Sequence, residues 1–241
     1  MIDAHCHLMD FRAPDIAGWK RAGLGAIVNC SYDFNSSKKA LELKRNEQEF
    51  TYCVVGVSPQ KCMGPEGEAQ VREVEGLARA NAGLVDGIGE IGLDFHWGDT
   101  PEKRAWQLKL FRRQIALALE LGKPIVVHAR DATRECINEL ESAGFSGNVQ
   151  FHFYSGNADE AKAIAQKGWL ISIPPIKGRA RLQAISAVPI ESLTAETDSP
   201  YVGKSPLDTR ESIRIIADIK GISEKEAERQ TSKNVRVLFS H

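Results

Sequence analysis

The chain has 241 residues, of which 42% are hydrophobic and 26% are charged, and its formal net charge is −1. This composition is that of an ordinary globular protein with ample material for a core. The balanced charge excludes a strongly basic protein that coats nucleic acid with its whole surface. A polyanionic substrate would have to be bound by a local basic patch.

Short apolar runs alternate with helix-forming segments along the whole chain. Strands are expected at residues 2–8, 25–30, 50–57, 84–93, 124–128, 148–152, 169–173 and 193–196. Helices are expected at residues 14–22, 35–48, 66–82, 101–121, 131–143, 157–167, 179–187, 208–220 and 224–239. The helix at 101–121 has the plainest signals, with Pro101 in its first turn and Gly122 just past its end.

The order of these elements indicates the fold class. Apolar strands without strict alternation, separated by helices, favour a parallel sheet that is covered on both faces. Eight such units in a chain of this length favour a closed (β/α)8 TIM barrel over an open doubly wound sheet. Because no repeat, low-complexity tract or linker divides the sequence, we expect a single domain over residues 1–241.

The cysteines and the N-terminus indicate the compartment. Five dispersed cysteines without a C-x-x-C pair suit reduced thiols better than a disulfide framework. The N-terminus has no basic segment followed by an apolar run, and no stretch of about 18 uncharged apolar residues occurs. We therefore expect a cytoplasmic protein with no membrane partner.

The first predicted strand has two histidines, His5 and His7, one residue apart. Successive side chains on a strand point to opposite faces, so these two share a face while Cys6 points away. Two imidazoles in this arrangement can converge on one cation, although such pairs also occur without a ligand. Catalytic groups in a barrel come from the C-terminal ends of several strands, so further ligands are expected where other strands end.

Four such residues occur. Glu90 lies toward the end of the fourth strand, His128 closes the fifth, His152 closes the sixth and Asp198 follows the eighth. Together with the first pair, this set exceeds what one tetrahedral zinc ion needs and favours two divalent ions about 3.5–4 Å apart. Glu90 is the natural bridge between them. Mixed imidazole and carboxylate ligands suit zinc, magnesium or manganese.

Other catalytic patterns have less support. The segment Gly87-x-Gly89-x-x-Gly92 matches a dinucleotide fingerprint, but it continues as Leu93-Asp94 instead of opening a helix, so no nucleotide cofactor is expected. There is no G-x-S-x-G elbow, and Cys6 faces away from the histidines. The nucleophile most consistent with the ligands is a metal-bound water.

Five stretches spread over the chain resemble one known family. They are Asp3-Ala4-His5-Cys6-His7-Leu8, Gly89-Glu90-Ile91-Gly92-Leu93-Asp94, Lys123-Pro124 with His128-Ala129-Arg130, His152-Phe153-Tyr154-Ser155-Gly156, and Glu196-Thr197-Asp198-Ser199-Pro200-Tyr201. In this order they resemble the TatD-like hydrolases, the metal-dependent deoxyribonuclease group within the amidohydrolase superfamily. The resemblance implies two metal sites, one held by His5, His7, Glu90 and Asp198 and the other by Glu90, His128 and His152.

Two segments depart from this resemblance. The family usually has Gly-Val-His-Pro after the third strand, where this chain has Ser58 in place of the histidine, and the residues after Tyr201 lack an arginine-rich stretch. Neither departure touches a proposed metal ligand. Both fall where contacts to a nucleotide would be expected.

The working hypothesis is hydrolysis of phosphodiester bonds in DNA or a short single-stranded nucleic acid. Glu90 and Asp198 are the expected catalytic carboxylates, with Asp198 accepting the proton of a water whose pKa the metals lower to about 7. Basic residues after strand ends are expected to contact phosphate, namely Arg130, Lys177, Arg179 and Lys204. Two alternatives stay open: an amidohydrolase acting on a small amide, lactone or ester, and a metal-binding barrel without catalysis.

Overall fold

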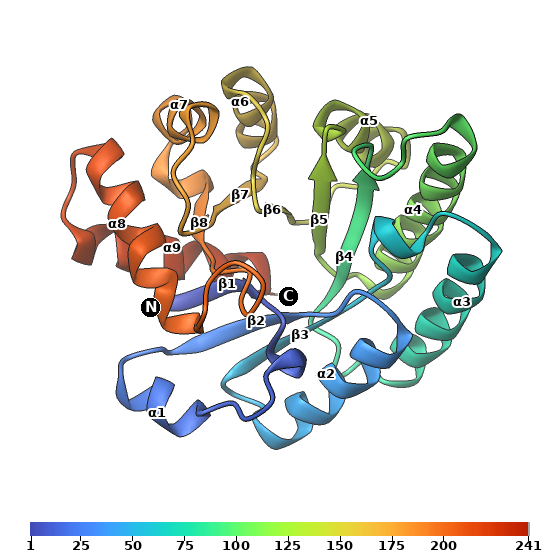
Figure 1. Cartoon of the computed structure of the whole chain (residues 1–241), viewed down its shortest axis with the longest axis horizontal. Helices are drawn as coiled ribbons and strands as arrows, with labels where there is room; N and C mark the ends of the chain where they lie inside the picture. The colour runs from blue at the N-terminus through green and yellow to red at the C-terminus, as the bar shows by residue number, and fades with distance from the viewer. Residues whose placement is uncertain (241) are drawn as a thin grey trace.

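Eight parallel strands follow one another around the molecule in chain order, with helices on the outside (Figure 1). The computed structural model describes residues 1–240. The strands are β1 (Ile2–Cys6), β2 (Ala26–Cys30), β3 (Thr51–Val55), β4 (Gly87–Asp94), β5 (Ile125–Arg130), β6 (Val149–His152), β7 (Leu170–Ile173) and β8 (Leu193–Ala195). The helices are α1 (Ile16–Arg21), α2 (Phe34–Asn46), α3 (Pro65–Ala80), α4 (Pro101–Leu121), α5 (Thr133–Ser142), α6 (Ala158–Gln166), α7 (Arg179–Ala187), α8 (Thr209–Lys220) and α9 (Glu224–Leu238).

The ring of strands is completed by the segment that follows β8. Cys6 and Ser199 form a parallel bridge, the amide of His7 donates to the Ser199 carbonyl at 2.8 Å, and the amide of Asp198 donates to the His5 carbonyl at 3.0 Å. The expected (β/α)8 barrel is therefore confirmed. The same closure brings Asp198 beside His5 and His7, although 190 residues separate them in sequence.

All the expected strands and helices are present, and their ends differ from the predictions by a few residues. The largest local difference in the first strand is at its end, because β1 stops at Cys6 and His7 precedes the short 3-10 turn η1 (Leu8–Asp10). Cys6 packs into an outer apolar cluster with Trp19 and Ile27, so it does point away from the barrel interior. None of the helices in residues 1–240 combines the length and apolarity that a membrane crossing needs.

The glycine-rich segment lies within β4 over its whole length, and the next helix begins only at Pro101. Gly92 has a φ of +144°, and a Cβ atom there would lie 2.1 Å from the carbonyl oxygen of His128. A Cβ atom on Gly89 would lie 2.7 Å from the carbonyl oxygen of Val126. These glycines are explained by the close approach of β4 to β5, which brings Glu90 next to His128.

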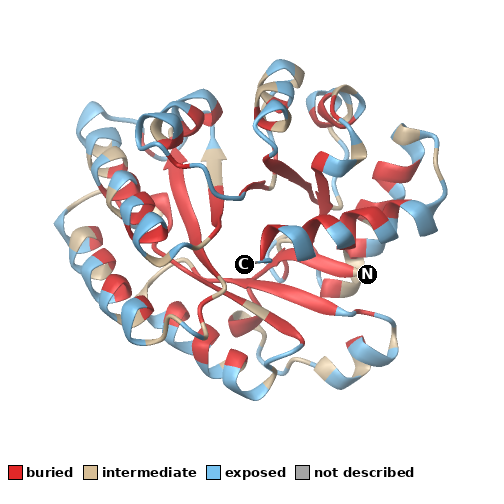
Figure 2. Ribbon diagram, turned by 180° about the vertical axis from the view of Figure 1, so that it is seen from behind, coloured by how far each residue is buried: buried red, intermediate tan, exposed pale blue. Residues whose placement is uncertain are grey.

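The lower end of the barrel, where the strands begin, is closed by α9. Val235, Leu238 and Phe239 pack in one apolar cluster with inward-facing residues such as Val28 and Val126. The Phe239 ring stacks on the Tyr52 ring with centroids 4.7 Å apart. Figure 2 shows the strands almost wholly buried and the outward sides of the helices exposed. Solvent therefore reaches the interior from the opposite end, where the strands finish.

Candidate metal centre

Six polar side chains converge at the C-terminal ends of the strands. The Nε2 atom of His5 lies 3.2 Å from Oε2 of Glu90, and the Nε2 atom of His152 lies 3.4 Å from the same oxygen. The Nε2 atom of His7 lies 3.2 Å from Oδ1 of Asp198. His128 completes the set with Nδ1 3.0 Å from Nε2 of His152 and 3.8 Å from Oε1 of Glu90. The structure thus brings together every residue predicted as a metal ligand.

Within this set, two groups of potential ligand atoms are compact enough for one ion each. The first is His5, Glu90 and His152, and the second is His5, His7 and Asp198. The grouping differs from the one implied by the resemblance, in which His128 and His152 share an ion with Glu90. The reason is geometric, because the His5 and His152 rings stack face to face with centroids 3.9 Å apart, while His128 lies at the edge of the cluster.

Two of the histidines are held from behind by hydrogen-bond acceptors. Nδ1 of His7 lies 2.8 Å from the carbonyl oxygen of Cys30, and Nε2 of His128 lies 3.1 Å from Oδ2 of Asp94. With the ring proton assigned to these nitrogens, the opposite nitrogen of each ring is left free to bind an ion. This is the usual arrangement of metal-binding histidines, in which a carbonyl or carboxylate fixes the tautomer.

The electrostatics of the cluster favour a bound positive charge. Burial alone would lower the pKa of His7, but its hydrogen bond with Asp198 and the charge of Glu90 outweigh burial and raise the pKa to about 9. Burial would raise the pKa of Glu90, yet the imidazoles of His152 and His5 hold that pKa well below its usual range. Burial and the neighbouring His5 lower the pKa of His152.

The residues present fit divalent ions on two grounds. Oε2 of Glu90 is buried amid three imidazole nitrogens but accepts no hydrogen bond within residues 1–240, and a buried polar atom without a partner calls for an explanation such as an unseen ion. The donors themselves, imidazole nitrogens and carboxylate oxygens, are those that zinc and related ions take in proteins.

Asp198 occupies a special backbone position in the loop after β8. Its φ is +49°, in the left-handed region that aspartate adopts more readily than most residues. The loop is held by Asp3, whose carboxylate accepts from the Thr197 amide at 3.0 Å and from the Thr197 hydroxyl at 2.6 Å. Burial raises the pKa of Asp3 to about 8. Asp3 therefore fastens the first strand to the loop that presents Asp198.

Two cavities open onto the cluster. One, of about 300 Å³, is lined by His7, Tyr32, Ser58, Gln60, Lys61, Glu90, His128, His152, Asp198 and Tyr201. The other, of about 440 Å³, is lined by His128, Ala129, Arg130, His152, Phe153, Ser155 and Asp198. Ser58, which stands where the family usually has histidine, lines the first cavity.

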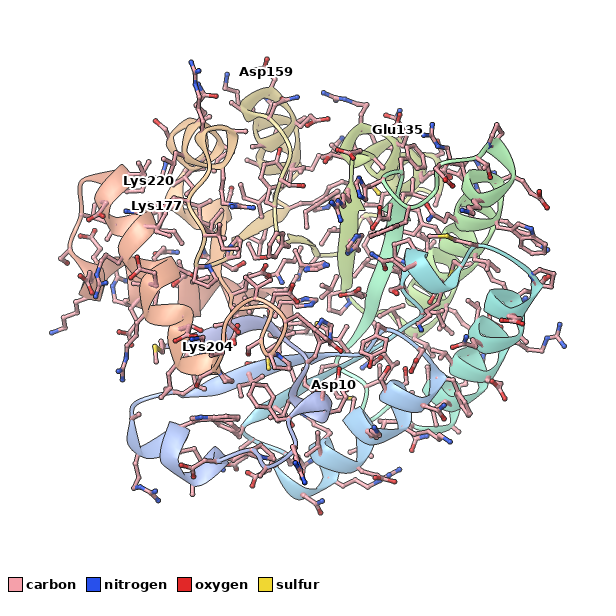
Figure 3. All side chains as sticks on the ribbon, viewed as in Figure 1. Asp10, Glu135, Asp159, Lys177, Lys204 and Lys220 are labelled. Carbon is pink, nitrogen blue, oxygen red and sulfur yellow. The ribbon has the colours of Figure 1, made fainter. Side chains whose placement is uncertain are left out.

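The basic residues predicted to contact phosphate fall in different places. Arg130 lines the second cavity, but Lys177 and Arg179 line a separate hollow with Ile219 of α8. In the view of Figure 3, the labels of Lys177, Lys220 and Lys204 all fall on the side of the molecule where α8 lies. Lys204 lines neither cavity at the cluster. Contact of these three with substrate stays a prediction.

The sequence interpretation missed several residues at the site. Asp94 was quoted only as part of a motif, yet it is fully buried and accepts from Nε2 of Gln60 at 2.7 Å as well as contacting His128. Alternation along β4 could have found it, because Glu90 and Asp94 are four residues apart and share a face. Tyr32 lies on the loop after β2, and Lys61 ends the short 3-10 turn η2 (Pro59–Lys61), where no comparable periodicity exists.

The cysteine thiols are not among the groups that converge at the site, although the backbone carbonyl of Cys30 contacts His7. All five are reduced and buried, and burial raises the pKa of Cys6 and Cys30 well above the usual value of a thiol. A thiolate nucleophile is therefore not favoured at these positions.

The fold and the cluster define a class of protein: a (β/α)8 barrel with a candidate metal centre at the C-terminal ends of its strands. Comparison with known proteins narrows this class. The family model described as TatD related DNase matches residues 2–240. The human protein named deoxyribonuclease TATDN3 is 30% identical, over 99% of this chain and 94% of its own length. An uncharacterized metal-dependent hydrolase of Methanocaldococcus jannaschii is 31% identical, over 99% of this chain and 96% of its own.

A solved structure agrees with this assignment. The TatD family hydrolase of Entamoeba histolytica superposes with a TM-score of 0.86 at 22% identity, covering 99% of this chain and 97% of that chain. The chain belongs to the TatD-related DNase family, and it is a metal-dependent hydrolase with a (β/α)8 barrel.

Proposed function

We propose that this hydrolase cleaves phosphodiester bonds of DNA with two divalent ions held by His5, His7, Glu90, His128, His152 and Asp198. The observation that carries the proposal is the position of Oε2 of Glu90, which lies between the Nε2 atoms of His5 and His152 and accepts no hydrogen bond from the described residues 1–240. The kinship with proteins named deoxyribonucleases supports the choice of substrate.

The two carboxylates have different surroundings and therefore different roles. The Glu90 side chain is 7% exposed and has imidazoles on several sides, which suits a ligand that bridges two ions. The Asp198 side chain is 17% exposed and lines both cavities, so an attacking water can reach it. Asp198 accepts the proton of that water. When bound, the ions supply charge neutralisation at the phosphoryl oxygens and a lowered pKa for water.

The proposal is tested with protein freed of metal by a chelator and then titrated with zinc, manganese or magnesium. Hydrolysis of an end-labelled single-stranded DNA is compared with that of RNA of the same sequence, and with panels of amides, lactones and esters. Cleavage of the carbon-centred substrates alone would contradict the proposal. Metal analysis of the loaded protein should find two ions per chain. Saturation at one ion per chain would contradict the proposal of two ions.

A matched pair of variants distinguishes the loss of a proposed metal ligand from a general effect of replacing a histidine. His128→Ala should abolish hydrolysis, because it removes a proposed ligand. His96→Ala should retain it, since His96 is exposed on the loop after β4, where its ring contacts Trp97. Retained hydrolysis in His128→Ala would refute the assigned site.

A further inference from the structure

The two cavities share three residues and otherwise draw on opposite sides of the barrel. Their common wall consists of His128, His152 and Asp198. We name the first the tyrosine cavity, defined by Tyr32, Tyr201 and Lys61, and the second the arginine cavity, defined by Arg130, Phe153 and Ser155. Tyr32, Lys61 and Tyr201 follow β2, β3 and β8, whereas Arg130, Phe153 and Ser155 lie at or after the ends of β5 and β6. These two groups of strands lie across the ring from each other (Figure 1). The metal centre therefore lies between them.

The rings of the tyrosine cavity are held in place before any ligand arrives. The hydroxyl of Tyr201 donates to Oδ2 of Asp10 at 2.8 Å, and the hydroxyl of Tyr32 donates to Oδ1 of the same residue at 3.3 Å. Both rings meet the His7 ring edge to face, with centroids 5.2 and 5.5 Å away. Tyr201 nevertheless remains 63% exposed. An exposed aromatic ring that is fixed beside a metal centre is suited to stacking on a flat ligand.

The arginine cavity also has an aromatic ring that is held in place and a basic side chain. The Phe153 ring is supported by Arg181, whose guanidinium carbon lies 5.3 Å from the ring centroid and whose Nε donates to the Tyr154 carbonyl at 2.9 Å. Arg130 provides an exposed guanidinium at the end of β5. Each cavity thus combines a fixed aromatic ring with one basic side chain, Lys61 in the first and Arg130 in the second.

From this symmetry we infer that the substrate spans the metal centre with one nucleoside in each cavity. This inference rests on the proposed function and adds to it. The bases stack on Tyr201 with Tyr32 on one side and on Phe153 on the other, while Lys61 and Arg130 contact the phosphates that flank the cleaved one. Stacking needs only the flat face of a base, so the subsites accept any sequence but require a base on both sides.

The inference is tested with dinucleotides that lack one base at a time. The substrates are dithymidine monophosphate and its two analogues in which a tetrahydrofuran abasic residue replaces either the 5′ or the 3′ nucleoside. All three keep the sugar–phosphate chemistry, so the rates compare base recognition alone. Each missing base should lower kcat/KM roughly 10- to 100-fold, the range that loss of one base–aromatic stack produces.

Variants assign each base to a cavity. Tyr201→Ala should erase the preference for a base on one side only, and Phe153→Ala the preference on the other side. Tyr201→Phe should restore the preference, because it keeps the ring and loses only the contact with Asp10. The matched control is Trp97→Ala, which removes a 55% exposed aromatic ring outside both cavities and should retain both preferences.

The outcomes separate this inference from the proposed function. If all three dinucleotides are cleaved within threefold of one another, the two subsites are overturned while the phosphodiesterase stands. If none is cleaved with any ion, the proposed function fails. The inference of two base subsites is then tested by the binding of the dinucleotides. Binding is measured by calorimetry on the metal-free protein with uncharged methylphosphonate versions of the three dinucleotides. The same order of affinities would support the subsites, and equal affinities or no binding would overturn them.

Discussion

The two ends of the barrel are built from the same strands but have opposite characters. At the lower end, residues such as Val54 and Val126 pack against Phe239 of the segment after α9. At the opposite end, which we call the mouth and where the strands finish, β4 and β5 carry Glu90 and His128. Two cavities open there. Along β5, Val126 belongs to the closed apolar cluster of the lower end, and His128, two residues later, belongs to the open polar cluster of the mouth.

This contrast indicates how the molecule divides its tasks. The lower end removes apolar surface from water and holds the strands together, and burial of apolar surface is the main favourable contribution to folding. The mouth gathers buried imidazoles and carboxylates that are costly to desolvate without an ion. We therefore expect substitutions at the mouth to change chemistry and substitutions at the lower end to change stability.

The largest effect is expected at the mouth. Glu90→Gln keeps the size of the side chain but removes the negative charge that lies among the imidazoles of His5 and His152. Hydrolysis should fall to the assay background, and metal analysis should find fewer than two ions per chain. Circular dichroism serves as the control for folding. A folded variant that still hydrolyses DNA would show that Glu90 is not a metal ligand.

The opposite result is expected at the lower end. Phe239→Ala removes a buried ring that stacks on Tyr52 and should lower the free energy of unfolding by about 3 kcal/mol. The activity of the folded protein at low temperature should not change. Val237→Ala, at a 53% exposed position near the end of α9, two residues before Phe239, should change stability by less than about 0.5 kcal/mol. Equal losses of unfolding free energy in the two variants would contradict the stabilising role assigned to the apolar cluster at the lower end.

The sequence predicted which histidines and carboxylates converge at the mouth, but it did not predict the loop residues that line the cavities, and the reason is physical. His128, His152 and Glu90 are on strands, where alternation and the common edge of a parallel barrel determine which side chains meet. Tyr32 and Tyr201 meet at Asp10 only because three separate loops converge, and no periodicity encodes that. The same limit applies to the basic residues, since Arg130 continues a strand whereas Lys177 lies on a loop that leads it to α8.

An intermediate effect is expected from the ions themselves. The proposed ligands come from five strands and their loops, so the ions bind the folded state and not the unfolded chain. At a free ion concentration 100 times Kd, binding should add about 2.7 kcal/mol of stability, which raises Tm by about 5–10 °C for a chain of this size. Differential scanning calorimetry with and without chelator measures the shift. The Glu90→Gln protein should show a much smaller shift, and an equal one would indicate that the ions bind elsewhere.

The smallest effect is expected at Asp94, which contacts the proposed ligand His128. Asp94 contacts Nε2 of His128 and accepts from Gln60, and it belongs to neither compact group of candidate ligands. Asp94→Asn should weaken metal affinity about 10- to 100-fold, the usual cost of losing the partner that orients a metal-binding imidazole. Competition with a chromophoric chelator measures the affinity. Asp99→Asn is the matched control, because Asp99 is exposed and pairs with Lys103 at 2.7 Å. If Asp94 only supports the fold, Asp94→Asn will lower the Tm of the metal-free protein and leave the affinity for metal unchanged.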